Sequence, residues 1–334
     1  MGAYIQGISY YLPKSALNND SLNQAFPEWS ADKISSKTGI FERRIANENE
    51  FSSDMAVKAS EALFNEFNIK RSDIDFILLC TQSPDYFLPT TACIVQDKLG
   101  INTSAGALDF NLGCSGYIYG LSLAKGLIKA DIAKNVLLIT SETYSKFINH
   151  QDKGNRTLFG DAASATLISS RVGLCSIEEF VLGTDGKGAE NLIVKNGAAK
   201  NRFETGVDEY DETGWIRNDS NLFMNGGEIF SFTSKAVPEM VDQILKKTSL
   251  TLPNIDLFVF HQANKFMLNH IRKKIDIPED KFFLFLEKCG NTVSSTIPIA
   301  LSEAIKTSRI KKTNKVLLAG FGVGYSWGST ILQF

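Results

Sequence analysis

The sequence has few of the residues that mark several common classes of protein. Its 334 residues include only three histidines and five cysteines, and no Cys-x-x-Cys pair is present. An odd number of widely spaced cysteines is typical of reduced thiols rather than of a disulfide framework. We therefore expect neither structural disulfides nor a bound metal ion; the cysteines are Cys80, Cys93, Cys114, Cys175 and Cys289.

Long apolar runs and an excess of basic charge are also missing. No stretch reaches the roughly 18 apolar residues of a membrane span, and the N-terminal residues 1–8 enter a strand pattern without the basic start of a signal peptide. The formal net charge is −2, and no extended cluster of Lys and Arg marks a nucleic-acid surface. With 43% hydrophobic and 22% charged residues, we expect a cytoplasmic globular protein without a membrane or nucleic-acid partner.

Apolar periodicity predicts strands that alternate with helices. Ser52 or Ser53 is expected to cap an amphipathic helix that ends at Phe67. The alternation predicts an α/β fold in which helices cover parallel strands on both faces. Residues 183–227, rich in Gly, Asn and Asp, are expected to form an irregular surface segment. The other expected strands are 3–10, 73–81, 106–110 and 135–141, and the other expected helices are 20–38, 89–99 and one that follows Cys114.

Three segments of the first half recur in the same order in the second half. Residues 72–80 match 253–261, residues 135–139 match 315–319, and residues 164–168 match 328–332. The first two pairs are separated by nearly equal lengths of chain, whereas the third pair requires an insertion in the first half between Ile139 and Ser164. A repeat of this length indicates two copies of one domain, which we place at residues 1–170 and 171–334.

Cys114 is the first candidate for a catalytic residue. It lies in the turn Gly113–Gly116, between an expected strand and an expected helix. The unpaired N–H groups of a helix N-terminus favour a thiolate, so we expect a lowered pKa for this cysteine. The flanking glycines allow the backbone to approach a bound acyl group closely. The alternative is a small apolar side chain that fills a gap beneath the helix.

His261 and Asn291 are the other two candidates. His261 follows a buried strand, where α/β folds carry their sites, and Asn291 occupies the place in the second half that corresponds to the Cys114 turn. A cysteine can hold an acyl group covalently, and imidazole and amide groups can stabilise an oxyanion. The alternatives are a structural histidine and a turn-forming asparagine. The remaining histidines, His150 and His270, are expected on solvated surfaces, and Glu142 and Asp161 in capping or structural roles.

These residues carry a resemblance to a known family. The chain resembles the β-ketoacyl-acyl-carrier-protein synthase III group of the thiolase superfamily nearly from end to end. A thiolase has a second cysteine, which is absent from 322–324 here, and elongating synthases have a second histidine where this chain has Asn291. The matching segments are Lys37–Arg44, the Cys114 turn, Phe159–Ala165, His261–Asn264, Gly290–Thr292 and Gly320–Gly328.

The resemblance implies a layered αβαβα fold, a homodimer and a decarboxylative Claisen condensation. Cys114 would accept an acyl group from acyl-CoA or another acyl thioester. His261 and Asn291 would bind the thioester carbonyl of malonyl-acyl-carrier-protein, whose enolate attacks the acyl-cysteine and gives a 3-oxoacyl product. The backbone N–H groups of Cys114 and Val323 would hold the oxyanion of the acyl-enzyme. The implied pathway is fatty acid biosynthesis, the implied partner is acyl carrier protein, and no metal or redox cofactor is implied.

The same resemblance assigns Lys37, Lys153 and Asn264 to substrate binding. Relatives often have arginines where this chain has Lys37, Lys153 and Phe266, and an aromatic residue that stacks on the CoA adenine where we place Lys33. Lysine keeps a phosphate's charge partner but lacks the bidentate fork of arginine. A primer delivered on an acyl carrier protein, or a specialised glycan or secondary-metabolite pathway, is therefore an alternative to acyl-CoA.

Phe87 and Leu88 are also assigned to substrate binding. In the family, the residue that matches Leu88 reaches across the dimer and closes the acyl pocket, and phenylalanine is common there in acetyl-specific enzymes. Leucine at this position favours a longer or branched acyl chain, although Phe87 stands beside it.

Two other functions remain open at this point. One is an acyltransferase that uses Cys114 to acylate an amine or a hydroxyl group. The other is a partner subunit of a heterodimeric condensing enzyme. Acylation of Cys114, and decarboxylation of a malonyl carrier by a Cys114→Gln variant, would favour the condensing enzyme over both.

Overall fold

The architecture is a large mixed sheet with helices on its faces. The structure is a computed structural model that describes residues 2–212 and 215–334. Nine strands of this part of the chain form the sheet, in the order β13-β14-β15-β8-β1-β7-β6-β4-β5. The strands are β1 (Tyr4–Tyr11), β4 (Phe76–Cys80), β5 (Gly106–Phe110), β6 (Asn135–Glu142), β7 (Ala162–Ser169), β8 (Cys175–Thr184), β13 (Leu257–Phe260), β14 (Lys315–Gly322) and β15 (Ser326–Gln333).

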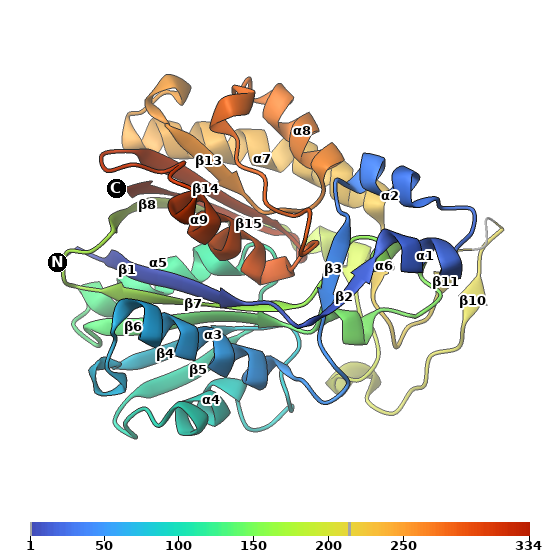
Figure 1. The fold of residues 1–334 in the computed structure, drawn as a ribbon, viewed down its shortest axis with the longest axis horizontal. Helices are drawn as coiled ribbons and strands as arrows, with labels where there is room; N and C mark the ends of the chain where they lie inside the picture. The colour runs from blue at the N-terminus through green and yellow to red at the C-terminus, as the bar shows by residue number, and fades with distance from the viewer. Residues whose placement is uncertain (1, 213–214) are drawn as a thin grey trace.

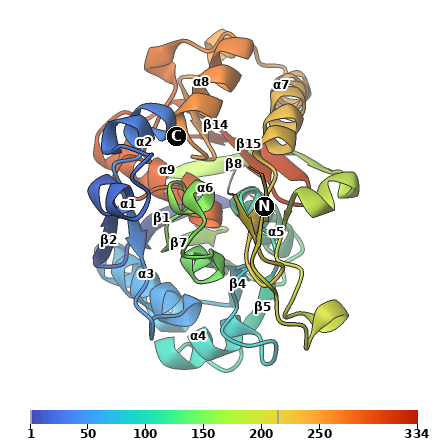
Figure 2. The same ribbon diagram turned by 90° about the vertical axis from the view of Figure 1, so that its right-hand side faces the viewer.

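The elements stack in five layers, as Figure 1 shows. Helices α7 and α8 cover the half of the sheet that runs from β13 to β8, and α3 and α4 cover the half from β1 to β5 (Figure 2). Helices α5 and α9 lie between the two halves, and α5 contacts both β4 and β14. The predicted layered α/β fold is therefore confirmed. The helices are α3 (Ser52–Phe67), α4 (Thr91–Leu99), α5 (Gly116–Lys129), α7 (Gly226–Thr248), α8 (Lys265–Lys274) and α9 (Thr296–Lys306).

The strand directions differ in part from the prediction. Strand β4 pairs in parallel with β5 and β6, and β13 pairs in parallel with β14, as expected for strands joined through helices. The remaining pairs of the sheet are antiparallel, including the short pairing of β1 with β8 that joins its two halves at Ile5 and Cys175. The sheet is thus mixed rather than parallel throughout.

The strand order has the same pattern on both sides of the β1–β8 pair. Outward from the centre, β1-β7-β6-β4 on one side corresponds to β8-β15-β14-β13 on the other. Beyond β13, Phe282 bridges Phe258 in parallel, in the place that β5 takes beside β4. Residues 143–161 separate β6 from β7, whereas only Val323–Tyr325 separate β14 from β15. This difference is the insertion that the repeat required; the division at residues 170 and 171 stays a prediction.

Helix α3 begins where its periodicity predicted, but with a different cap. The N-cap residue is Phe51, and its backbone N–H donates to the Asp54 carboxylate at 3.1 Å. The two serines expected to cap the helix make other hydrogen bonds: the Ser52 hydroxyl donates to the Ser83 carbonyl, and Ser53 Oγ accepts from Lys98. A carboxylate in the first turn satisfies a backbone donor that a serine cap would otherwise leave to water.

Two excursions from the sheet build the region around the site. The first lies between β1 and α3, and the second, between β8 and α7, is mostly irregular, as its composition predicted. The excursions and the β6–β7 insertion contain short elements: β2 (Ser15–Asn18), α1 (Asn19–Ala25), α2 (Ala31–Thr38), β3 (Glu42–Ile45), η2 (Tyr144–Phe147), α6 (Lys153–Arg156), η3 (Gly186–Asn191), β9 (Leu192–Ile193), η4 (Ala199–Asn201), β10 (Glu209–Tyr210), β11 (Ile216–Arg217) and β12 (Phe223–Met224). The other short helices are η1 (Arg71–Asp73), η5 (Leu252–Asn254), η6 (Glu279–Lys281) and η7 (Val293–Ser295).

Candidate active site

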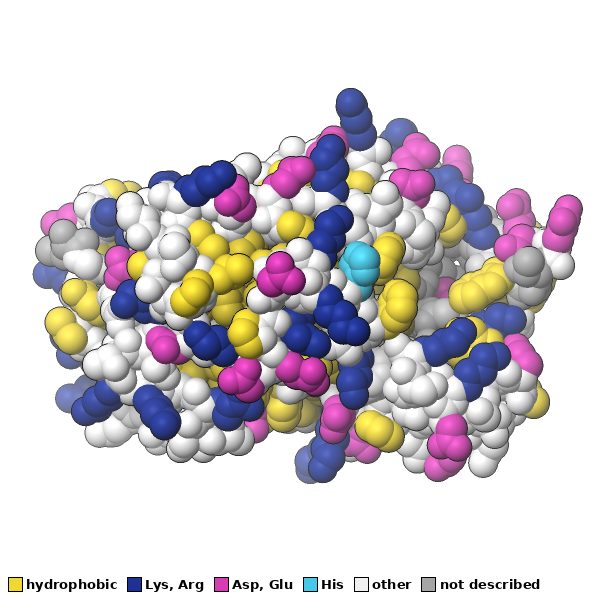
Figure 3. Space-filling view, turned by 90° about the horizontal axis from the view of Figure 1, so that it is seen from above, with side chains coloured by type: hydrophobic (Ala, Val, Ile, Leu, Met, Phe, Trp, Pro, Cys, Tyr) yellow, Lys and Arg dark blue, Asp and Glu magenta, His cyan; other side chains and the backbone are white. Residues whose placement is uncertain are grey.

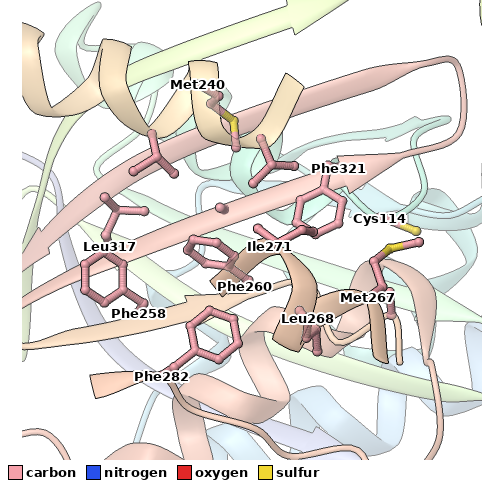
Figure 4. Close-up of a cluster of buried hydrophobic side chains, with 14 of the residues drawn as sticks. Cys114, Met240, Phe258, Phe260, Met267, Leu268, Ile271, Phe282, Leu317 and Phe321 are labelled. Atoms are coloured by element: carbon pink, nitrogen blue, oxygen red, sulfur yellow. The ribbon is translucent and has the colours of Figure 1, made fainter. Parts of the chain in front are cut away.

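Cys114 lies in the turn between β5 and α5, two residues before the helix begins. Two glycines close to it, Gly116 and Gly322, have no room for a side chain. A Cβ atom on Gly116 would lie 2.2 Å from the Cys80 Sγ atom, and one on Gly322 would lie 2.9 Å from the Cys114 Sγ atom. Figure 4 shows Cys114 at the edge of a cluster of buried apolar side chains, near Phe321 and Met267.

The expected lowering of the Cys114 pKa is wrong. Burial, which disfavours the thiolate, and to a smaller extent the nearby Glu142 carboxylate raise the pKa of this thiol to about 12. Only 5% of Cys114 is exposed. The backbone N–H groups of Cys114 and Val323 act in the opposite direction, since both approach the sulfur, but they do not outweigh burial. The resting side chain is therefore a neutral thiol.

His261 follows directly on β13, where the sequence predicted it. Its backbone N–H donates to the Ala319 carbonyl at 2.8 Å, which ties the residue to β14. Its Nδ1 atom lies 2.7 Å from Thr296 Oγ1, and its ring meets the ring of Phe321 edge to face at a centroid distance of 5.6 Å. Burial lowers the pKa of His261 to about 3, so the imidazole is neutral near pH 7.

Asn291 is held by both of its backbone groups and by its side-chain oxygen. Its N–H donates to the Leu158 carbonyl at 2.8 Å, and its carbonyl accepts from Gly160 N–H at 3.0 Å. Its Oδ1 atom accepts from Val293 N–H at 3.0 Å. Since this fixes the oxygen, the amide nitrogen is left as a donor that makes no hydrogen bond within the described residues.

Val293 connects the histidine to the asparagine. Its N–H donates to Asn291 Oδ1, and its carbonyl oxygen lies 3.0 Å from Thr296 Oγ1 and close to the His261 ring. The residue is buried and has a φ of 55°, in the left-handed region that β-branched residues rarely adopt. Strain of this kind persists where the surrounding contacts enforce it, commonly at functional sites.

The end of β14 brings the three candidates to one place. Its residues 320–322 pack against Cys114 on one side, and Phe321 packs against His261 on the other. Asn291 joins them through Val293. The structure therefore gathers a thiol, a neutral imidazole and a primary amide from three separate loops around one strand end. No direct bond joins the three side chains to one another among the described hydrogen bonds.

A cavity of about 1080 Å³ lies beside this group. Leu158, whose carbonyl binds Asn291, and Asn264, three residues after His261, belong to its wall. Cys114, His261 and Asn291 are not among the residues that line it. The other lining residues include Trp29, Lys37, Asp152, Tyr210, Trp215, Arg217, Leu222 and Phe266. The cavity is large and mostly apolar, as expected for a long thioester substrate.

The predicted substrate-binding residues have different surroundings. Lys37 and Asn264 line the cavity, and Asn264 also caps α8 by accepting from Met267 N–H at 2.9 Å. Lys153 lies beside the cavity, where it pairs with Glu28 at 3.2 Å and stands over the Trp215 ring. Phe87 and Leu88 lie outside the cavity and are 75% and 86% exposed on this chain. Their role stays a prediction that requires a second copy of the chain.

Two tryptophans at the cavity were not predicted from the sequence. We expected Lys33 in place of an aromatic residue, but Trp29, four residues earlier, lines the cavity, and Lys33 and Lys37 both lie over its ring. Trp215 meets Trp29 edge to face, with 6.5 Å between the ring centroids. Trp29 is in a loop before α2, and Trp215 in the irregular excursion, where periodicity gives no signal.

Glu142, for which we expected a capping or structural role, ends β6 and is fully buried. Its carboxylate accepts from the Ser294 hydroxyl at 2.7 Å, from Gln82 N–H at 3.1 Å and from the Ser83 hydroxyl at 3.3 Å. Burial is the main reason that the pKa of Glu142 rises to about 8. Asp161 does take the predicted structural role, since it accepts from Ser145 and Ala46 N–H groups.

The pKa of Glu142 predicts how stability depends on pH. A carboxyl group with a higher pKa in the folded than in the unfolded state binds its proton more tightly when folded. Its contribution to stability therefore decreases as the pH rises from the ordinary carboxyl range to about 8. We expect Glu142→Gln, which stays neutral and can still bond Gln82 and Ser294, to gain free energy of unfolding relative to the parent as the pH rises from about 5 to about 9.

Urea unfolding at the two pH values checks this prediction. Glu190→Gln, on the exposed surface, is the control for removing one negative charge. A difference between Glu142→Gln and the parent that stays constant with pH would contradict the assignment.

No helix in the ranges 2–212 and 215–334 is long and apolar enough to cross a membrane. In the same ranges, no three or more His, Cys, Asp and Glu side chains are grouped so that they could hold a metal ion.

The layered fold, with a cysteine before one central helix and an asparagine before the other, defines a condensing enzyme of the thiolase type. Family models for the 3-oxoacyl-[acyl-carrier-protein] synthase III and its C-terminal part match residues 108–186 and 245–334. The chain is 38% identical over 327 residues to beta-ketoacyl-[acyl-carrier-protein] synthase III of Clostridium perfringens, which covers 98% of each protein. The chain belongs to this synthase III family.

Solved structures agree with the sequence comparison. A crystal structure of a 3-oxoacyl-(acyl-carrier-protein) synthase III is 48% identical, covers 100% of both chains and has a TM-score of 0.98. The 3-oxoacyl-(acyl-carrier protein) synthase from Burkholderia xenovorans LB400 is 36% identical, with a TM-score of 0.90 over 100% of this chain and 94% of its own. The predicted family is thus confirmed, and with it the predicted class of acyltransferase.

Proposed function

We propose that the protein condenses an acyl thioester with malonyl-acyl-carrier-protein through an acyl-cysteine intermediate. Cys114 attacks the acyl thioester, which releases the carrier thiol and leaves the acyl group on the sulfur. Decarboxylation of the malonyl thioester then forms an enolate, and its carbon attacks the acyl-cysteine. The new carbon–carbon bond replaces the carbon–sulfur bond, so that a 3-oxoacyl carrier leaves and the thiol is restored.

The pairing of a neutral imidazole with a free amide donor beside the thiol carries this proposal. His261 is kept uncharged by burial, and the Asn291 oxygen is occupied by Val293 N–H. Both side chains are thus suited to donate hydrogen bonds to an enolate oxygen in a site of low polarity. The N–H groups of Cys114 and Val323, which approach the sulfur, are suited to hold the oxyanion of the acyl-enzyme.

The high pKa of the Cys114 thiol requires that its proton leave during attack. The proton passes to the thiol group that the acyl donor releases, so that neither the cysteine nor the leaving group stays ionised. Once the acyl group is attached, the cysteine can no longer ionise, because a thioester is neutral. Burial that disfavours a free thiolate therefore does not disfavour the intermediate.

The cavity supports a thioester on a long phosphopantetheine arm. Its two tryptophans offer flat surfaces beside Lys37, and basic side chains gather on the face that Figure 3 shows. Helix α8, whose last turn contains Arg272, Lys273 and Lys274, lies on this side of the fold. Phe266, 65% exposed, adds an apolar surface in place of a cation. We propose acyl carrier protein as a partner, acyl-CoA or an acyl carrier as the primer donor, and no metal or redox cofactor.

The assembly and the cell compartment are part of the same proposal. We propose a homodimer, because Tyr86, Phe87 and Leu88 form an exposed apolar tip on the β4–α4 loop that a second copy would bury. A cytoplasmic location follows from the proposed substrates.

A panel of acyl-CoAs and acyl carriers tests the function. The protein is incubated with each donor, and the mass added to Cys114 is read by peptide mass spectrometry, followed by product analysis after malonyl-acyl-carrier-protein is added. We expect an acyl adduct on Cys114 that disappears as a 3-oxoacyl carrier forms. The proposal is wrong if no donor acylates Cys114, or if the adduct is passed to an amine or to water instead.

A further inference from the structure

The Thr296 side chain contacts the His261 ring at its Nδ1 atom. Thr296 is the first residue of α9 and is 2% exposed. Its Oγ1 atom lies 2.7 Å from His261 Nδ1 and 3.0 Å from the Val293 carbonyl oxygen. The other ring nitrogen, Nε2, makes no hydrogen bond within the described part of the chain and is left for a substrate.

The hydroxyl group has one proton and two acceptors for it. A neutral imidazole also carries only one N–H, either on Nδ1 or on Nε2. If the Thr296 hydroxyl donates to Nδ1, the ring proton must be on Nε2. If the hydroxyl donates to Val293, the ring can donate from Nδ1, and Nε2 is a bare acceptor.

The two distances favour the first arrangement. A separation of 2.7 Å is at the short end for an N–H donating to oxygen but ordinary for an O–H donor. A separation of 3.0 Å is at the long end for an O–H donor and a carbonyl acceptor. The hydroxyl proton therefore belongs to the shorter contact.

We propose that Thr296 is a positioning residue that fixes the tautomer of His261: its hydroxyl donates to Nδ1, so that Nε2 carries the proton and donates to the enolate. This inference rests on the proposed function, in which an enolate forms beside His261. Thr296 does not touch the substrate and acts only through the ring.

The Val293 carbonyl is the reason that the Thr296 hydroxyl is needed to keep the ring proton on Nε2. This carbonyl lies close enough to the His261 ring to accept a hydrogen bond from it. Without the Thr296 hydroxyl, Nδ1 would keep the ring proton and donate it to Val293. Nε2 would then direct a lone pair at the enolate oxygen, which replaces an attraction by a repulsion.

Thr296→Val removes the hydroxyl and keeps the shape of the side chain. Wild type and variant are first loaded with an acyl group, and the loss of the Cys114 adduct is then followed in a single turnover with malonyl-acyl-carrier-protein. We expect loading at the wild-type rate and a second step that is slower by about 100-fold, the usual loss for one oxyanion donor. Thr296→Ser, which restores the hydroxyl, is expected to recover most of the rate.

The matched control is Thr330→Val. Thr330 is equally buried, on β15, and its hydroxyl oxygen has no hydrogen-bond partner among the described residues. The same isosteric change should therefore leave both steps unaltered.

The tautomer itself is read by ¹⁵N NMR of ring-labelled histidine. The sequence has only three histidines, so His150→Gln and His270→Gln assign the His261 signals by elimination. We expect a protonated Nε2 in the wild type and a protonated Nδ1 in Thr296→Val. A wild-type ring protonated on Nδ1 overturns the inference even if no variant folds, as does a Thr296→Val enzyme with an unchanged second step.

The proposed function and the proposed role of Thr296 can be disproved independently. If the wild-type protein never consumes its adduct with malonyl-acyl-carrier-protein, the proposed function is wrong, whereas the NMR result still decides the tautomer. If the wild type condenses but Thr296→Val matches it, only the role of Thr296 is wrong.

Discussion

Replacement of Cys114 by serine is expected to abolish the acyl adduct and to lower condensation by about 10⁴-fold or more, as for other enzymes that lose a covalent nucleophile. The serine hydroxyl is smaller and far less acidic than a thiol, and no base in the described site is poised to ionise it. The serine side chain fits the site, because Gly322 and the turn already accommodate the larger cysteine. The measurement is intact-protein mass after incubation with acyl donor, together with product formation.

Cys93→Ser is the matched control, because Cys93 is the exposed cysteine and the one most open to chance acylation. It should retain the adduct and full turnover. If the Cys114→Ser protein is acylated to the same extent as the wild type, another residue carries the acyl group and the mechanism is wrong.

Asn291→Asp is expected to produce the second largest effect. Aspartate keeps the acceptor that binds Val293 N–H and therefore the orientation of the side chain. It replaces the free N–H₂ donor by a carboxylate oxygen, which places a negative charge where the enolate forms. We expect the condensation step to fall by about 10³-fold, at the upper end for loss of an oxyanion donor.

Loading of Cys114 separates this effect from misfolding, since acyl transfer to the thiol does not require the amide. We expect loading of Asn291→Asp to be unchanged, and Asn18→Asp, which keeps its N-cap bond to Ser21 N–H, to be unaltered in both steps. Equal losses in loading and condensation would place Asn291 in the structure of the site rather than in its chemistry.

The sequence predicted the elements of the fold better than the surroundings of the site. Helix α3 and strand β5 have their predicted bounds, because strong periodicity and nearby turn residues mark both. The Cys114 pKa was predicted in the wrong direction, because the helix terminus is visible in the sequence but the burial of the sulfur by Gly322 and its neighbours is not.

The missed residues have a common reason. Trp29 and Trp215 reach the cavity from loops far apart in the chain, and only the folded excursions bring them within 6.5 Å. Glu142 sits on a strand of ordinary composition, and its three hydrogen bonds come from residues up to 152 positions away. The Val293 conformation has no sequence signal at all, since valine is among the residues least suited to a positive φ.

The excursions and the sheet supply different parts of the site. The wall of the cavity comes mostly from the segments that leave the sheet, whereas the thiol, the imidazole and the amide are fastened to the ends of its central layers. A substitution in an excursion can therefore alter which acyl chain the cavity accepts without moving the side chains of Cys114, His261 and Asn291.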